Sequence, residues 1–513
     1  MKNFLNKLIL CGGAFFLLKS GSAISQPVSL LPQRNDVQDQ HSQLILQEQT
    51  GFWEGTPPLI IETYFSKLPV EISSITLRHL YHEVLKEKYG PLLQNSTYEK
   101  TLFSYLEKIG HLEQAKEFLL ETNLPDKDHL LLDLQWLAGD SKKACEKVTH
   151  LLRAVADEEW KKQNIYCLYL NGETERGKIA AELLNESNPE GLFLINALFE
   201  SSVSPSFDAS LNDSPFLLTV WCTIGHDIPE ESLKTMSPSS LALIARAEKM
   251  PLQTRLVAAE KALQSGALKG EFLLNLLKHE TGDELLEKFT QELKSPNAEL
   301  LLPLFEKAKT ENKLGLVAQI FKPFFAKIEF SSETLPLAPY MVRAFLEAGE
   351  KDLAQKWGAF FMRESPEDAI EVLPLLHLVF PKNQWGEIQL QAWQLYQNRV
   401  HSKIASQNSY TLRHVLEALG EEAGSPLKGE SPEPSWRQKK ALFDEKTADL
   451  LDSAVKSKRR GEVLLLVLIL IGETPLKDLV PDIFIHLVES LNKVGYKDEA
   501  HFLALEYLIA QGI

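Results

Sequence analysis

Cysteine is scarce in this sequence. Four cysteines occur in 513 residues, and loss of an N-terminal signal would leave Cys145, Cys167 and Cys222. A small disulfide-rich domain is excluded, because a chain of this length can bury a large core without cross-links. Two of the three remaining cysteines lie in apolar surroundings, which favours buried free thiols; the alternative is one disulfide with a leftover thiol.

Complete motifs for nucleotide or zinc-protease chemistry are also lacking. The segment GETERGKI at 172–179 has the glycine and lysine spacing of a phosphate loop, but Ile179 stands where a Ser or Thr would hold magnesium. The pair His279-Glu280 with Asp283 matches part of a zinc-protease helix, yet the second histidine is absent. We expect a repeat turn at the first segment and a solvated helix end at the second.

Three further patterns are typical of ordinary surface residues and do not indicate a functional site. His79, His82 and Glu83 lie on neighbouring helical turns, but no third histidine accompanies them. Carboxylate pairs such as Glu230-Glu231 and Glu421-Glu422 are frequent in so acidic a chain. Ser425 and Lys428 have the spacing of an acylating serine and its lysine, but they fall in a Pro/Gly-rich loop. We therefore expect a protein that is not an enzyme, with no catalytic residue, no cofactor and no metal site.

Basic residues are outnumbered by acidic ones. Asp and Glu total 70 against 54 Lys and Arg, a net charge of −16 that becomes −19 if a signal carrying Lys2, Lys7 and Lys19 is removed. Such a chain repels nucleic acid and anionic lipid at long range, so we expect neither as a partner. Hydrophobic residues at 44% and charged residues at 24% are typical of a globular protein, which excludes disorder for most of the chain.

Apolar runs are short. Leu8 to Leu18 is an 11-residue block between Lys7 and Lys19, too short to span a bilayer, and small residues follow it. This pattern predicts a secretory signal over 1–25 and a periplasmic or otherwise extracytoplasmic location. The alternative is an uncleaved anchor, and we expect membrane association only at this end. The run 463–471 predicts a buried helix instead, with the basic cluster before it forming a solvated turn.

Helical periodicity covers most of the chain beyond a polar leader. Residues 26–50 are rich in Gln, Ser and Asp and predict a flexible leader. Beyond it, apolar residues recur at helical spacing, and strand patterns are nearly absent. A Pro- and Gly-rich segment at 424–436 predicts a linker or loop. We therefore expect a helical-repeat array over 51–423 and a C-terminal helical unit over 437–513.

One local pattern recurs five times. A glycine is followed five residues later by a small residue, with apolar residues on both sides, at Gly110/Ala115, Gly139/Ala144, Gly172/Gly177, Gly349/Ala354 and Gly495/Ala500. The glycine predicts the end of one helix, and the small residue lets a second helix pack closely against the first. Each pattern therefore predicts a helical hairpin. Spacings of 29 and 33 residues between the first three glycines are typical of stacked helix pairs.

These hairpins resemble the tetratricopeptide repeat, whose inter-helix turn has a glycine or small residue with alanine five residues further on. Pro189 and Pro366 each lie 17 residues after a turn glycine, where that repeat places its helix-ending proline. Seven residues before the turn, where the repeat usually has a close-packing glycine, this chain has the large apolar residues Phe103, Leu132, Ile165, Val342 and Val488. The resemblance implies an all-α, tetratricopeptide-like superhelix of αα-hairpins in which the repeats are degenerate.

A second resemblance covers more of the chain. Segments 52–69 and 134–145 and the end LNKVGYKDEAHFLALEYLIAQG resemble those of uncharacterised exported helical-repeat proteins of Gram-negative bacteria. This resemblance implies an envelope location and brings no activity. We therefore expect a non-enzymatic protein-interaction scaffold of the bacterial cell envelope, with a protein partner held on an extended concave face. The alternative is a cell-wall polymer-binding protein or enzyme subunit with a helical superhelix.

Overall fold

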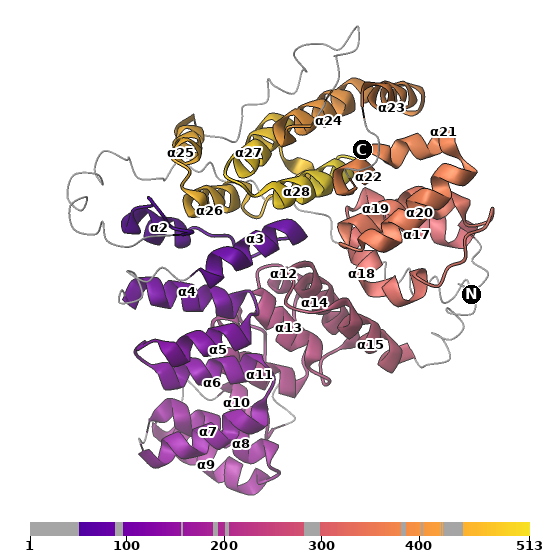
Figure 1. The fold of residues 1–513 in the computed structure, drawn as a ribbon. Coiled ribbons are helices and arrows are strands. Elements are labelled where there is room, and N and C mark those ends of the chain that lie inside the picture. Colours follow the sequence, from indigo (N-terminus) through magenta and orange to yellow (C-terminus); the bar gives the residue numbers. More distant parts are fainter. Residues whose placement is uncertain are drawn as a thin grey trace. The chain divides into compact units, whose positions relative to one another are not determined.

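A computed structural model gives the fold of the protein. It describes residues 51–87, 96–154, 157–187, 193–200, 205–281, 298–380, 386–401, 404–421, 423 and 445–513. Within these ranges every regular element is a helix and none is a strand (Figure 1), which confirms the expected all-α class. The expected signal at 1–25, the leader at 26–50 and the linker at 424–436 lie outside the described residues.

The helices fall into two compact units. Unit 1 is formed by the described residues of Leu92–Leu276, and unit 2 by those of Ser20–Pro91 and Leu277–Ile513. This division differs from the linear order of domains expected from the sequence. In unit 2, α3 near the N-terminal end packs against α26 and α28 near the C-terminal end, and α28 also packs against α22 and α24. Residues 445–513 therefore belong to the same unit as the N-terminal helix α3 and as the helices α22 and α24.

Unit 1 begins with three helix pairs in succession. They are α4 (Ser96–Lys108) with α5 (Leu112–Glu121), α6 (Lys127–Leu137) with α7 (Ser141–Ala154), and α8 (Glu158–Leu170) with α9 (Thr174–Ser187). Each helix from α4 to α9 packs against the next one along the chain. The rest of the unit is α10 (Phe193–Asn196), η4 (Ala209–Asp213), α11 (Pro215–Ile224), α12 (Glu230–Leu233), α13 (Pro238–Arg246), α14 (Leu252–Gln264) and the start of α15 (Gly270–Thr281).

Unit 2 combines two N-terminal helices with a longer C-terminal set. The first are α2 (Pro58–Phe65) and α3 (Ile75–Lys86). The next are α17 (Ala298–Thr310), α18 (Leu314–Phe325), η5 (Leu335–Leu337), α19 (Ala338–Glu347), α20 (Lys351–Glu364), α21 (Pro366–Ala369), η6 (Ile370–Val372), α22 (Leu373–Val379), α23 (Glu387–Val400) and α24 (Ala405–Leu419). The last are α25 (Glu445–Lys456), α26 (Arg460–Ile471), η8 (Leu476–Asp478), α27 (Pro481–Lys493) and α28 (Lys497–Ala510).

All five predicted turns are helical hairpins with one geometry. The turn glycines have left-handed φ angles of 86°, 74°, 78°, 77° and 98° in chain order. At the first turn, Gly110 donates its N–H to the carbonyl of Glu107 and His111 donates to that of Leu106, and the same two bonds recur at the other four. This bond pair satisfies carbonyls that the helix end leaves open, and it needs a residue that tolerates positive φ. The hairpin prediction is therefore confirmed.

Two more turns of the same geometry lack a glycine. Asn312 joins α17 to α18 and Lys458 joins α25 to α26, with φ angles of 57° and 53° and the same pair of backbone bonds. Non-glycine residues pay a steric cost in this region, with asparagine the least penalised. Unit 2 therefore contains two successive pairs of hairpins, and in each the turn residues lie 37 positions apart: Asn312 to Gly349 and Lys458 to Gly495.

The flanking positions of the turns form the core of each hairpin. The residue five positions after the turn is buried in all seven hairpins, and so is the large apolar residue seven positions before it. Gly177 shows the constraint at its tightest, since a Cβ there would lie 2.8 Å from the Phe199 ring. α20 ends at Glu364, and Pro366 begins α21 two residues later, which agrees with the predicted helix end; Pro189 lies outside the described residues.

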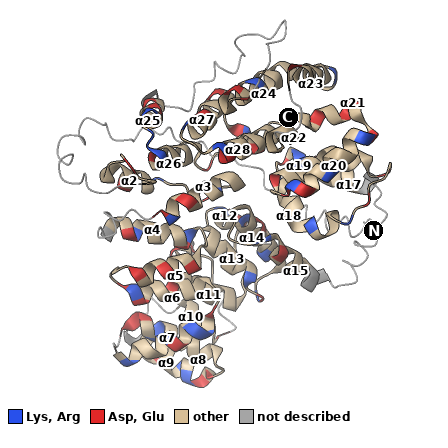
Figure 2. Cartoon of the chain, in the orientation of Figure 1, with Lys and Arg blue, Asp and Glu red and all other residues tan. Residues whose placement is uncertain are grey.

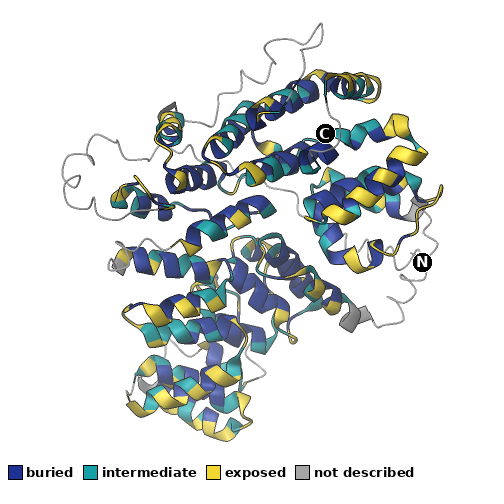
Figure 3. Cartoon of the chain, in the orientation of Figure 1, coloured by how far each residue is buried: buried dark blue, intermediate teal, exposed yellow. Residues whose placement is uncertain are grey.

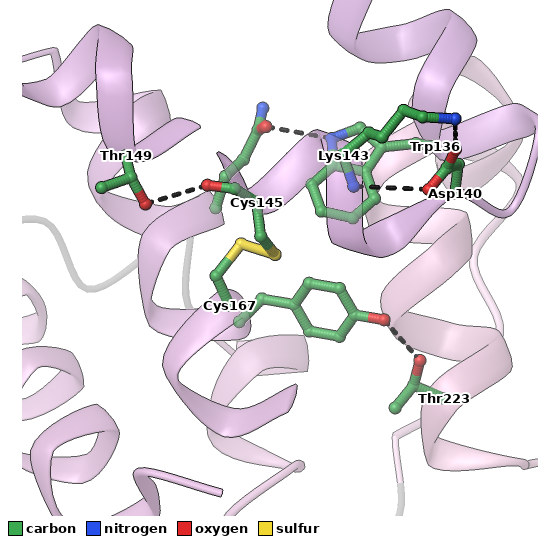
Figure 4. The surroundings of a disulfide bond; sticks show 9 residues. Trp136, Asp140, Lys143, Cys145, Thr149, Cys167 and Thr223 are labelled. Carbon is green, nitrogen blue, oxygen red and sulfur yellow. Dashed lines mark hydrogen bonds and ion pairs between the residues drawn. A yellow bond between two sulfur atoms is a disulfide. The ribbon is translucent and has the colours of Figure 1, made fainter. Parts of the chain in front are cut away.

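A disulfide joins neighbouring hairpins of unit 1. Cys145 of α7 is bonded to Cys167 of α8 (Figure 4), so the expected free thiols are wrong for these two residues. Beside it, the hydroxyls of Tyr166 and Thr223 share a hydrogen bond of 2.6 Å that connects α8 to α11. Among the cysteines that the structure describes, Cys222 is the one free thiol; burial raises its pKa to about 12, which leaves it unreactive at neutral pH.

The apolar run at 463–471 is part of α26, which is buried on nearly all sides as predicted (Figure 3). The basic cluster before it is only partly solvated. Arg459 is buried at the start of α26 and donates two bonds, of 2.6 and 3.2 Å, to Glu462 in the first turn of the helix. Among the described helices, none combines the length and apolarity that crossing a bilayer requires.

Candidate functional site

Three carboxylates on the first helices of successive hairpins form the acidic row of unit 1. They are Glu107 of α4, Asp133 of α6 and Glu159 of α8, each half-buried. Burial raises the pKa of Glu107 to about 7. Burial, and then the charges of Glu107 and Glu159, raise the pKa of Asp133 to about 7 as well. Glu107 and Asp133 therefore hold protons near neutral pH, and a basic group placed against them would stabilise their ionised forms.

One side of the first helices is covered by later parts of the same unit. Helix α10 packs against α8, α11 against α6, and α13 against both α4 and α6. The aromatic rings of Trp136, Tyr166 and Phe216 meet there, with centroids 5.5 to 5.7 Å apart. The apolar positions of α6 and α8 on this side are therefore filled by the packing of the unit itself. Along these helix pairs acidic and basic residues are interspersed (Figure 2).

Unit 2 contains a buried polar cluster around Arg343. This residue is 1% exposed and donates to Glu371 at 2.7 Å and to the backbone oxygens of Pro339 and Ile513 at 3.2 and 3.3 Å. The second oxygen of Glu371 accepts a bond of 3.1 Å from Tyr396. Burial opposes ionisation of Glu371, but Arg343 and then other neighbours hold its pKa below the usual range. The cluster therefore ties α19, η6 and α23 together.

Lys309 stands next to this cluster. Burial, followed by the positive charge of Arg343, lowers its pKa to about 8. It lies one turn beyond Phe305, whose ring centroid is 6.0 Å from that of Tyr340 on α19. A lysine with a lowered pKa is a candidate nucleophile or base. The polar groups around it, however, bond to one another and to backbone, which is the arrangement of a structural cross-link.

The structure places the sequence motifs on ordinary helices. The segment 172–179 covers the turn between α8 and α9 and the first residues of α9. A helix therefore precedes it where a phosphate loop needs a strand, and Lys178 lies 3.8 Å from Glu175. His279 and Glu280 lie in the last turn of α15, and Asp283 is outside the described residues.

The remaining candidates are on separate elements. Glu83 lies on α3 with both histidines of its motif and pairs with Lys86 at 3.6 Å, and Glu230-Glu231 begins α12. Glu421 follows α24 and lies 3.4 Å from His501, whereas Glu422 and 425–428 are outside the described residues. Among the residues that the structure describes, no three His, Cys, Asp or Glu side chains are grouped closely enough to hold one metal ion.

Sequence reasoning missed both charged clusters. Their signal is a single charged residue inside an apolar helical stretch, as with Asp133 in LLLDLQW and Arg343 in YMVRAFL. Such a residue is costly to bury unless other groups compensate it. Which groups do so depends on helices that are distant in the sequence, and the pattern therefore gives the residue without its partners.

Comparisons with known proteins add no relative. No protein-family model, no curated protein and no solved structure matches the chain. Any function proposed for the chain therefore rests on the fold and on the two charged clusters.

Proposed function

We propose that this protein is a non-enzymatic protein-interaction scaffold of the bacterial cell envelope. In this proposal its helical hairpins stack as tetratricopeptide-like repeats, and the acidic row of unit 1 contacts a basic segment of a partner protein. Repeat arrays bind partners through surfaces that extend over several hairpins, so no single deep pocket is needed.

The observation that carries the proposal is the uniform geometry of the hairpins. Seven turns share the same backbone bonds and the same buried flanking positions, and three of these hairpins follow one another directly in α4 to α9. A series of equivalent first helices places one side chain from each hairpin along a common surface. Glu107, Asp133 and Glu159 occupy different positions relative to their turns, but the charges of Glu107 and Glu159 both act on Asp133, so the three carboxyl groups lie near one another across three hairpins.

The disulfide supports the proposed location. Cys145 and Cys167 are bonded, and structural disulfides form and persist in oxidising compartments such as the bacterial periplasm. The basic start, apolar block and small residues of 1–25 point to the same compartment. These two features are independent, because one is a local sequence pattern and the other depends on the packing of α7 and α8.

A pull-down with charge-neutral variants tests the scaffold. Chemical crosslinking in cells, followed by recovery through a C-terminal tag and mass spectrometry, is done on the wild type and on the triple variant E107Q/D133N/E159Q. We expect the wild type to recover a reproducible envelope protein and the triple variant to recover at least tenfold less of it. Recovery of wall polymer without a protein partner would favour the polymer-binding alternative instead.

A matched control separates the acidic row from bulk charge. The variant E113Q/E117Q/E146Q replaces the same number of carboxyl groups at exposed positions on the second helices α5 and α7. We expect it to recover the partner as the wild type does. Equal loss in both variants would show that only the net charge matters, and equal recovery in both would remove the acidic row as the contact surface.

A further inference from the structure

Helix α23 of unit 2 has polar residues on its buried face and aliphatic residues on its exposed face. Gln394 and Gln397 are both 0% exposed, whereas Ile388 is 78% and Leu395 is 66% exposed. A surface helix normally shows the opposite pattern, because burying an aliphatic side chain is favourable and burying an amide without a hydrogen bond is costly. The position of the two amides therefore requires a compensating interaction.

Trp393 lies beside the two amides. It is also 0% exposed, and it precedes Gln397 by four residues, while Gln394 precedes Gln397 by three. Residues at these two spacings are neighbours on the surface of a helix, with Cβ atoms about 5–6 Å apart. Trp393, Gln394 and Gln397 therefore form one continuous inner patch of α23. Asn408 of α24 donates a hydrogen bond of 3.1 Å to Oε1 of Gln397, which places that amide between α23 and α24.

Four polar groups of the inner patch have no hydrogen-bond partner within the part of the chain that the structure describes. They are Nε1 of Trp393, the amide nitrogen and the amide oxygen of Gln394, and the amide nitrogen of Gln397. Most buried polar groups in folded proteins are hydrogen-bonded, and an unsatisfied one lowers the folding equilibrium constant by roughly 5- to 150-fold. Four such groups within five residues of one helix indicate that a further molecule binds there.

The surroundings of the inner patch restrict what this molecule is. Helix α23 packs against η6, α24 and α22, whose fully buried residues include Val372, Leu375 and Leu412. The three side chains of the patch have no exposed surface, so the molecule has to be small enough to enter the core. All four groups are neutral, and three of them are donors while one is an acceptor. An ion would meet no opposite charge among them, whereas a water molecule can both accept and donate.

We propose that the inner patch of α23 is an internal water site, in which ordered water bridges Trp393, Gln394 and Gln397. Internal waters typically make two to four hydrogen bonds to buried polar groups, and this patch supplies four groups from three side chains. The bound water offsets the cost of the buried amides and fixes the orientation of α23, which leaves Ile388 and Leu395 at the surface. The site belongs to unit 2 and does not depend on the acidic row of unit 1 or on the partner proposed for it.

A high-resolution crystal structure of the wild-type protein tests the site directly. We expect electron density for ordered water within about 3.2 Å of the Gln394 amide and of Nε1 of Trp393. Protein groups in hydrogen-bond contact with these atoms in place of water would overturn the proposal, and so would a patch without ordered density or with a larger solute. This measurement needs no variant, so it decides the question even where a substitution prevents folding.

The sign of a stability change gives a second test. Gln394→Met keeps an unbranched side chain of similar length but removes the amide. In a hydrated patch this variant takes away hydrogen bonds to the water, and we expect the folding equilibrium constant of unit 2 to fall by at least about fivefold. In a dry patch the same variant removes an unsatisfied amide, so the equilibrium constant would rise. Urea unfolding of the full-length protein, followed by hydrogen exchange of peptides from α23 and α24, measures the change.

Gln391→Met is the matched control on the exposed face of the same helix. Gln391 is exposed and donates a bond of 3.2 Å to Glu387 at the surface. We expect this control to change the folding equilibrium constant by less than about twofold. A more stable Gln394→Met variant, or a change no larger than that of the control, would reject the water site.

Discussion

Reduction of the disulfide should destabilise unit 1 by a predictable amount. Cys145 and Cys167 are 22 residues apart in the sequence. Cross-linking a loop of this length removes conformational entropy from the unfolded chain worth about 3 kcal/mol. The bond joins α7 to α8, so its loss acts on the contact between two successive hairpins. Unit 2 contains neither cysteine and should be unaffected.

The assay is urea unfolding with and without dithiothreitol, combined with hydrogen exchange of peptides from α7 and α8. With a urea dependence of 1–3 kcal/mol per molar, typical of small domains, about 3 kcal/mol corresponds to a midpoint shift of roughly 1–3 M for unit 1. The double variant C145A/C167A should lose a similar amount without reductant. It loses slightly more if the alanines leave cavities, since both cysteines are buried.

Cys222 provides the control. It is buried and not bonded to another cysteine, so C222A should keep the full response to reductant. Thiol counting under denaturing conditions gives an independent check, with one free thiol expected among the three cysteines beyond position 26. Three free thiols in the purified protein, or an unchanged midpoint after reduction, would refute the reasoning.

Two further predictions concern the turns and the buried polar cluster. Gly139→Ala should lower the free energy of unfolding by about 1–2 kcal/mol, because alanine is strained at a φ of 74°. The added Cβ would meet no neighbouring side chain or backbone within 4 Å, so no clash adds to this cost. Gly110→Ala should cost more, since its Cβ would lie 2.8 Å from that of Ala267; equal thermal shifts in the two variants would contradict this account. Glu371→Leu should destabilise unit 2 by about 3–5 kcal/mol in urea, because it leaves Arg343 buried without its carboxylate, and a loss below about 1 kcal/mol would argue against the cluster.

Local rules made the hairpins predictable. A glycine in the left-handed region ends a helix whatever the rest of the chain does, and a buried small residue five positions later fixes where the next helix packs. Both requirements are met within a dozen residues, so the sequence alone located five turns. The same argument predicted the buried helix at 463–471, because a helix that is apolar on all sides has to be covered.

The turns at Asn312 and Lys458 were not predicted, because the local pattern there lacks the glycine. Asparagine and lysine adopt positive φ only at a cost, and it is the packing of the two helices that offsets this cost. The Arg343 cluster was missed for a related reason. Its sequence signal identifies a charge that needs compensation, but the compensating Glu371 comes from another element.

Tertiary structure alone decided which distant residues meet. Thr76 and Glu506 are 430 positions apart, and no periodicity relates them, yet their bond joins the first part of unit 2 to its last helix. The pairing of Cys145 with Cys167 likewise depends on how α7 lies against α8. The sequence by itself determined the helices and most of their turns, because those depend on short-range backbone preference and apolar spacing. Contacts between distant helices depend on how the whole core packs, and they created the disulfide, the Arg343 cluster and the bond between Thr76 and Glu506.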